Sequence, residues 1–141
     1  MRLKEKLKGT KEVLDRIKEK NQTTPIIVEG KKDVKALRRL GIRGEIIKIK
    51  THQRIFHIIE NLRDEYQGVI ILTDWDPTGS RLYHRIKKAC KANDIEYNER
   101  FRKELVKYVK GEVKDIEGLP KFIKRVERIT KNPYNARKNR K

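Results

Sequence analysis

The feature that most limits the fold of this chain is an unbroken apolar run, Val69-Ile70-Ile71-Leu72, which leads directly into the polar segment 73–80. A run of this length and composition is typical of a central strand in a parallel sheet, where both faces of the strand are buried. A second run, Ile26-Ile27-Val28, has the same character. Helices are therefore expected on both faces of the sheet that contains these strands.

Apolar residues at helical spacing separate the predicted strands. A short helix capped by Asp33, a strand over 45–50, a helix capped by Thr51, a helix from near Gly79 and a strand around Ile95 and Tyr97 follow in that order. This alternation predicts an α/β fold with a doubly wound, mostly parallel sheet. The alternation runs from Ile26 to Tyr97.

Both ends of the chain add helices to this core. The spacing of Leu3, Leu7, Leu14 and Ile17 predicts an N-terminal amphipathic helix within residues 1–22. Residues 101–130 predict a helical C-terminal extension packed on the core, and residues 131–141 form a basic tail. A length of 141 residues suits a single compact domain with such extensions.

The charge of the chain indicates an anionic partner. Thirty-eight Lys and Arg against 20 Asp and Glu give a formal net charge of +18, and nucleic acid is the obvious candidate. No stretch approaches the roughly 20 apolar residues that span a bilayer, and no signal-peptide pattern is evident. We therefore expect a cytoplasmic protein with no membrane partner. The single cysteine, Cys90, excludes an intramolecular disulfide and a Cys-rich zinc site.

Three acids directly follow the apolar strands. Glu29 follows the first run, and Asp74 and Asp76 follow the second. The carboxyl ends of parallel strands meet at one edge of a sheet, and residues two apart in an extended segment point the same way. Converging carboxylates repel one another unless a cation lies between them, and oxygen ligands suit Mg²⁺, with Mn²⁺ as a substitute. The alternative is a polar turn at Asp74 and Asp76, with Glu29 as a surface acid.

Other residues near these acids have competing interpretations. Lys31, Lys32, Arg81 and Arg85 could contact phosphates, although a charged helix face is more often simply solvated. Trp75 could stack on a base or cover the edge of the sheet. A second acidic cluster is attributed to loop and helix-start chemistry and left outside the site; it consists of Glu112, Asp115 and Glu117.

The segments "IIVEGKKDVKAL" and "VIILTDWDPTGSRL" resemble the two signature motifs of the Toprim domain. Bacterial primases, type I and II topoisomerases, recombination-mediator proteins and small RNA-maturing nucleases share that domain. The resemblance covers residues 23–100, and the whole chain is similar to small stand-alone archaeal Toprim proteins. It implies a Rossmann-like fold. It also assigns Glu29 as general acid/base and metal ligand, Asp74 and Asp76 as metal ligands, and Gly30 and Gly79 as motif glycines.

The resemblance implies a Mg²⁺-dependent phosphoryl-transfer protein that acts on nucleic acid. A nuclease or RNA-processing enzyme is favoured, with RNA preferred over DNA because of the RNA-maturing relatives. The extra domains of topoisomerases and primases do not fit in this chain, so neither of those complete activities is expected. The alternative is a non-catalytic nucleic-acid-binding module of a larger complex. The sequence names no protein partner and no oligomeric state.

Overall fold

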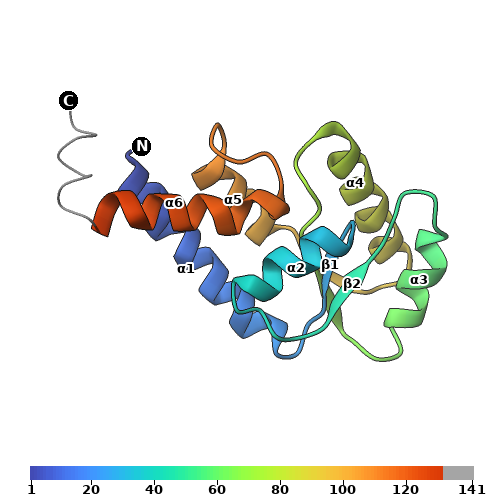
Figure 1. Ribbon diagram of the computed structural model, residues 1–141. Coiled ribbons are helices and arrows are strands. Elements are labelled where there is room, and N and C mark those ends of the chain that lie inside the picture. Colours follow the sequence, from blue (N-terminus) through green and yellow to red (C-terminus); the bar gives the residue numbers. More distant parts are fainter. Residues whose placement is uncertain (132–141) are drawn as a thin grey trace.

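A computed structural model describes residues 1–131 of the chain (Figure 1). Its four strands form one fully parallel sheet in the order β2-β1-β3-β4. In chain order the elements are α1 (Leu3–Asn21), β1 (Ile26–Val28), α2 (Lys31–Arg39), β2 (Ile46–Lys48), α3 (Ile55–Leu62), β3 (Gly68–Ile71), α4 (Pro77–Ala92), β4 (Glu96–Asn98), α5 (Arg100–Val109), the short 3₁₀ helix η1 (Ile116–Gly118) and α6 (Leu119–Lys131).

The two central strands divide the core into two layers. Ile26, Val28 and Ile70 face one side of the sheet, and Ile27 and Ile71 face the other, because successive side chains of a strand point to opposite faces. All five side chains are completely buried. The prediction of central strands buried on both faces is therefore confirmed, and with it the α/β fold with helices on both sides of a parallel sheet.

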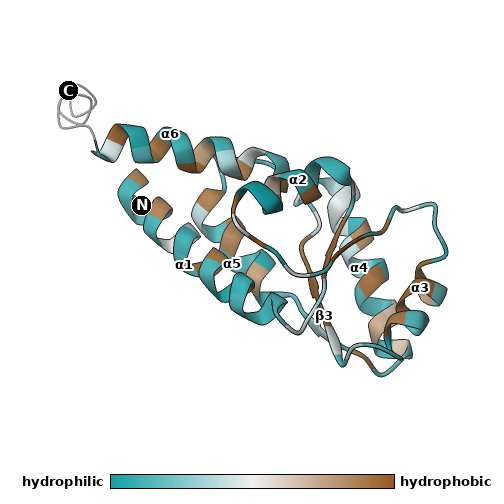
Figure 2. Cartoon of the chain, turned by 60° about the horizontal axis from the view of Figure 1, so that its bottom comes forward, coloured by the Kyte–Doolittle hydropathy of each residue, from teal (hydrophilic) through white to brown (hydrophobic). Residues whose placement is uncertain are grey.

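Helices cover the two faces unequally. The first face packs against α1, α2, α5 and α6, whereas the second packs against α3 and α4 (Figure 1). In Figure 2 the strands are largely brown, while the helices carry brown and teal residues in alternation. This is the pattern of amphipathic helices that bury one side against a sheet. The layer that contains α1, α2, α5 and α6 is the larger of the two.

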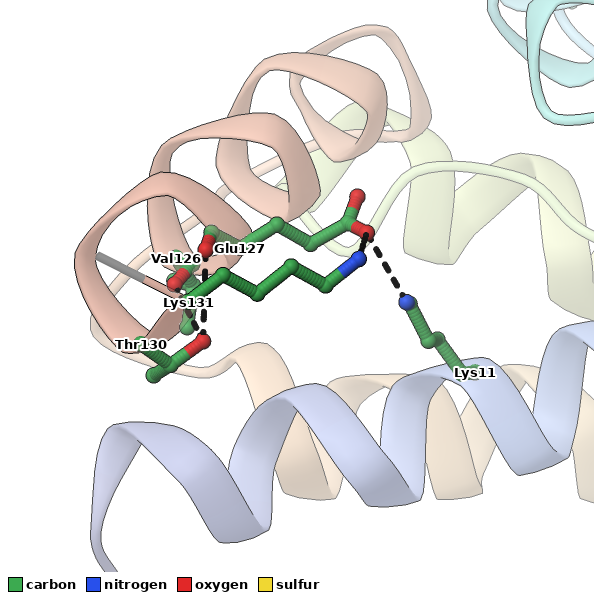
Figure 3. A network of polar contacts seen from close by, with 5 residues as sticks. All are labelled: Lys11, Val126, Glu127, Thr130 and Lys131. Atoms are coloured by element: carbon green, nitrogen blue, oxygen red, sulfur yellow. Dashed lines mark hydrogen bonds and ion pairs between the residues drawn. The ribbon is translucent and has the colours of Figure 1, made fainter. Parts of the chain in front are cut away.

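The N- and C-terminal helices are joined by packing and by polar contacts. Gly9 of α1 faces the ring of Tyr108 in α5, where a Cβ atom would lie only 2.2 Å from a ring carbon. The Glu127 carboxylate in α6 accepts hydrogen bonds from Lys11 of α1, at 3.0 Å, and from Lys131, at 3.1 Å (Figure 3). These contacts hold the two ends of the chain together as one layer.

Three predicted helix starts differ from the structure. Gly30, not Asp33, occupies the N-cap of α2. Asp33 is the third residue of the helix, and its carboxylate accepts a hydrogen bond of 3.1 Å from the Gly30 N–H. Thr51 does not cap α3, because residues 50–53 form a turn in which Gln53 accepts from the Lys50 N–H at 2.7 Å. Helix α4 begins at Pro77 rather than near Gly79, because proline is well accommodated at the first position of a helix. The predicted basic tail lies outside the described residues from 132 onward.

Candidate functional site

The acids singled out by the sequence lie at the carboxyl edge of the sheet. Glu29 directly follows β1, and Asp74 follows the neighbouring strand β3. Both border an open cleft of about 400 Å³. The remaining lining combines basic and acidic side chains with the start of α2: Gly30, Lys31, Lys32, Asp33, Lys50, Thr51, His52 and Glu117.

Asp74 is the most perturbed acid in this cleft. Burial, together with the nearby negative charges of Asp33, Asp115 and Asp76, raises the pKa of its carboxyl to about 6. A hydrogen bond from the backbone N–H of Ile116, at 3.0 Å, acts in the opposite direction. The carboxyl of Asp74 is therefore poised to take up a proton, or a cation, near neutral pH.

Negative charges near Glu29 also affect the pKa of its carboxyl. Partial burial raises the pKa of its carboxyl, and Asp74 and Asp76 add to the increase, whereas the ammonium group of Lys50 lowers it. A carboxyl with a raised pKa is suited to proton transfer. Asp74 thus lies close enough to Glu29 to raise the pKa of its carboxyl, in line with the adjacent positions of β1 and β3 in the sheet.

Asp76 caps the helix that follows it. It occupies the N-cap of α4, and its Oδ1 accepts from the backbone N–H of Gly79 at 2.6 Å. Gly79 is required here because a Cβ atom at this position would lie 2.1 Å from the carbonyl oxygen of Asp74. The other motif glycine, Gly30, has an extended backbone and open space around its Cα. The turn role that the sequence left open for Asp76 is therefore present in the structure.

A buried arginine donates hydrogen bonds to the loop after β3. Arg102 of α5, only 9% exposed, donates from Nε to the carbonyl of Thr73 at 2.8 Å and from Nη2 to the carbonyl of Asp74 at 2.7 Å. Its Nη2 also reaches the hydroxyl of Ser80 at 3.3 Å. Burial lowers the pKa of the guanidinium, and the negative charges of Asp74 and Asp76 oppose that change. Arg102 was not predicted as a site residue from the sequence, because no local spacing connects it to residues 73–80.

The segment before α6 also belongs to the site. The indole Nε1 of Trp75 donates to the carbonyl of Val113 at 3.0 Å, which ties this segment to the loop after β3. Glu117 borders the cleft, and Asp115 lies near enough to raise the pKa of Asp74. Both acids therefore lie near the predicted site, and Asp115 also has the helix-start role assigned to it from the sequence, because it caps η1 by accepting from the Gly118 N–H at 2.9 Å.

The four predicted phosphate contacts fall into two groups. Lys31 and Lys32 begin α2 and border the cleft, with both side chains exposed. Arg81 and Arg85 lie along α4, outside the lining of the cleft. Arg81 approaches the hydroxyl of Thr78 at 3.4 Å, and the guanidinium of Arg85 donates to the carbonyl of Thr51.

The oxygen donors of the site suit Mg²⁺ in their chemistry. The carboxylates at this edge are hard oxygen donors that repel one another, which is the chemistry that a hard divalent cation satisfies. As the side chains stand, however, residues 1–131 contain no group of three Asp, Glu, His or Cys positioned to hold a metal ion. Asp74 and Asp76 each direct one oxygen to a backbone N–H instead. The chemistry of the site thus fits Mg²⁺, and the metal would need side-chain adjustment.

Residues 24–127 match the Toprim domain, and the chain belongs to this family, whose members generally act on nucleic acid with a metal ion. Within the family it is similar to small archaeal proteins. A UPF0292 protein of Methanocaldococcus jannaschii is 33% identical over 87% of this chain and 96% of its own length. A UPF0292 protein of Thermococcus onnurineus is 34% identical over 82% and 84%, respectively.

A solved structure has a similar fold. A putative protein from Aquifex aeolicus superposes with a TM-score of 0.66 and 28% sequence identity, covering 75% of this chain and 94% of that one. The resemblance drawn from the two motifs is therefore confirmed at the level of family and fold. Among the helices formed by residues 1–131, none is long and apolar enough to cross a membrane.

Proposed function

We propose that this protein cleaves a phosphodiester bond of nucleic acid, preferentially RNA, with the help of Mg²⁺. One observation carries the proposal: Glu29 and Asp74 lie at the ends of adjacent strands and border one cleft, the pKa of each carboxyl is raised, and the charge of Asp74 contributes to the raised pKa of Glu29. An exposed lysine pair, Lys31 and Lys32, borders the same cleft and could hold the phosphates on either side of the reacting bond.

The proposed ligands of Mg²⁺ are Asp74 and Asp76, with Glu29 as a further oxygen donor. When bound, the cation would neutralise charge that develops on the phosphoryl group. Glu29 is proposed to move the proton between the attacking or leaving oxygen and solvent, because its carboxyl is only partly buried and its pKa is raised. The base of the cleft is kept in place by Arg102 through the carbonyls of Thr73 and Asp74.

A second candidate function is a nucleic-acid-binding module without turnover. It is favoured by the hydrogen bonds that Asp74 and Asp76 make to backbone N–H groups, since these occupy one oxygen of each proposed ligand. A chain with a net charge of +18 would bind nucleic acid through its phosphates in either case. The two candidates differ only in whether metal binding leads to cleavage.

Cleavage of end-labelled RNA and DNA, single-stranded, duplex and hairpin, tests the proposal. Wild type would be compared with Asp74→Asn and Glu29→Gln in Mg²⁺ and in Mn²⁺. Matched controls are Asp64→Asn and Glu60→Gln, which make the same chemical changes at exposed positions outside the cleft. We expect cleavage by wild type and by both controls, and at least a hundredfold loss in both site variants.

Two outcomes would decide against this assignment. Cleavage that continues unchanged in Asp74→Asn would show that the metal ligands are wrong. Binding that weakens steeply with salt, together with no cleavage of any substrate by any of the five proteins, would favour the non-catalytic module.

A further inference from the structure

A second hollow lies between α3 and α4, on the face of the sheet opposite the terminal helices. Helices α3 and α4 pack side by side (Figure 1), and a groove of about 670 Å³ runs along their junction. Its floor is apolar, formed by Ile55, Ala89 and Ala92. Its rim carries polar and basic side chains.

The charge of this groove has one sign. Arg54, Arg85 and Lys88 line it, together with His57, and no acidic residue does. Helix α4 as a whole contains five Lys or Arg and neither Asp nor Glu: Arg81, Arg85, Lys87, Lys88 and Lys91. Within residues 1–131, the three cations of the lining take part in none of the salt bridges. Their charge is therefore free to meet an anionic ligand.

An exposed aromatic ring lies in the same groove. Phe56 keeps 46% of its surface exposed, and among the described residues only Phe56 and Met1 are large apolar side chains exposed to this degree. The ring of Phe56 meets His57 edge to face, with 5.9 Å between centroids and an interplanar angle of 89°. An exposed ring between cations is the arrangement on which unpaired bases stack while the backbone phosphates are neutralised.

The groove is connected to the acidic cleft by one short segment. Lys50, Thr51 and His52 border the cleft, while the next two residues, Gln53 and Arg54, border the groove. Arg85, which lines the groove, donates a hydrogen bond to the carbonyl of Thr51, which borders the cleft. A ligand that lies in the groove would therefore reach the cleft by crossing residues 50–54.

We propose that the α3–α4 groove binds a single-stranded segment of nucleic acid, with one base stacked on Phe56 and phosphates on Arg54, Arg85 and Lys88, and directs that strand toward the acidic cleft. The directing role rests on the proposed function, whereas binding in the groove does not. A protein segment would also fit an apolar floor, but the uniform positive charge of the rim favours the polyanion. A duplex would contact the cations without presenting a base face to Phe56.

The test is equilibrium binding to a fluorescein-labelled single-stranded RNA of about a dozen nucleotides, followed by fluorescence anisotropy in EDTA so that no cleavage intervenes. The duplex of the same sequence is measured in parallel. The variants are Phe56→Ala, Phe56→Tyr and Lys88→Ala, chosen because these side chains are exposed. Lys124→Ala is the matched control for charge, because Lys124 is exposed and belongs to α6, a helix that lies apart from α3 and α4 (Figure 1).

We expect Phe56→Ala to weaken single-strand binding by about tenfold and duplex binding by less than about twofold, with Phe56→Tyr close to wild type. Lys88→Ala should weaken both and reduce the slope of log K against log salt by about 0.7 on the single strand, while Lys124→Ala leaves that slope nearer to wild type. Wild-type affinity in both Phe56→Ala and Lys88→Ala would overturn the proposal and leave a protein segment as the occupant of the groove.

The same proteins separate this inference from the proposed function. If Phe56→Ala loses single-strand binding while wild type cleaves nothing in Mg²⁺, the groove is supported and the nuclease assignment fails. If wild type cleaves RNA and the groove variants bind and cleave like wild type, the nuclease assignment is supported and the groove fails.

Discussion

The carboxylate of Asp74 accepts a hydrogen bond from the backbone N–H of Ile116, 42 residues further along the chain, at a distance of 3.0 Å. This contact, together with that between Trp75 and Val113, attaches the segment before α6 to the loop after β3. The C-terminal part of the chain is therefore a wall of the acidic cleft. The match to the Toprim domain, which extends to residue 127, agrees with this arrangement.

Asp74→Asn is expected to stabilise the metal-free protein above pH 6. The pKa of Asp74 is raised from 3.8 to about 6, so the folded state binds more protons than the unfolded state between these values. Wild-type stability from this group is consequently present at low pH and is lost as pH rises through about 6. One pKa unit corresponds to about 1.4 kcal/mol, and partial exposure reduces the effect, so a gain of about 1–2 kcal/mol is expected at pH 7.5.

Urea denaturation in EDTA at pH 4.0 and 7.5 measures this difference. Asp64→Asn, a change at an exposed aspartate, is the control and should alter stability by less than about 0.5 kcal/mol at both pH values. An Asp74→Asn protein less stable than wild type at pH 7.5 would show that the hydrogen bond from Ile116 outweighs burial of the charge.

Mg²⁺ is expected to raise the melting temperature of wild type, and to raise it more at pH 7.5 than at pH 5. The ligand carboxylates must be ionised to bind the cation, and protonation of Asp74 below about pH 6 competes with it. Differential scanning fluorimetry across a Mg²⁺ titration gives the shift at each pH. An equal shift in Asp74→Asn, or the same shift with K⁺ at matched ionic strength, would contradict binding at this site.

Gly79→Ala is expected to destabilise the protein by roughly 2 kcal/mol or more. The new Cβ would lie 2.1 Å from the Asp74 carbonyl, so that the loop after β3 or the start of α4 has to move. Gly30→Ala, with open space around its Cα and an extended backbone, should change stability by less than about 1 kcal/mol. Urea denaturation of both variants at pH 7.5 makes the comparison, and similar losses would indicate that the close approach at Gly79 is relieved easily.

Arg102→Met is expected to cost about 2–4 kcal/mol of stability, because it leaves the carbonyls of Thr73 and Asp74 without their donor in a buried setting. Arg100→Met is the control, since that side chain is exposed and, within residues 1–131, pairs only with Glu104, at 3.2 Å. Chemical denaturation measures both. A loss in Arg102→Met no larger than that in Arg100→Met would show that water replaces the guanidinium at these carbonyls.

Much of the fold could be predicted because its signals are local. The runs Ile26–Val28 and Val69–Leu72 correspond to the two central strands, the helical spacing located α1 to α4 to within a few residues, and the predicted helical extension contains α5 and α6. The errors fell at helix starts, where capping depends on hydrogen bonds rather than on periodicity. At residues 50–53, for example, a turn closed by Gln53 delays α3 beyond the predicted cap at Thr51.

The sequence by itself determined which residues form strands, that Glu29, Asp74 and Asp76 follow two of them, and that the chain carries the motifs of its family. These features depend on side-chain alternation and on short spacings, which can be read along the chain. Only the tertiary structure decided the strand order and brought Arg102, Asp115 and Glu117 to the acidic edge. Those contacts join segments far apart in the chain, and their formation depends on how whole helices pack rather than on any local pattern.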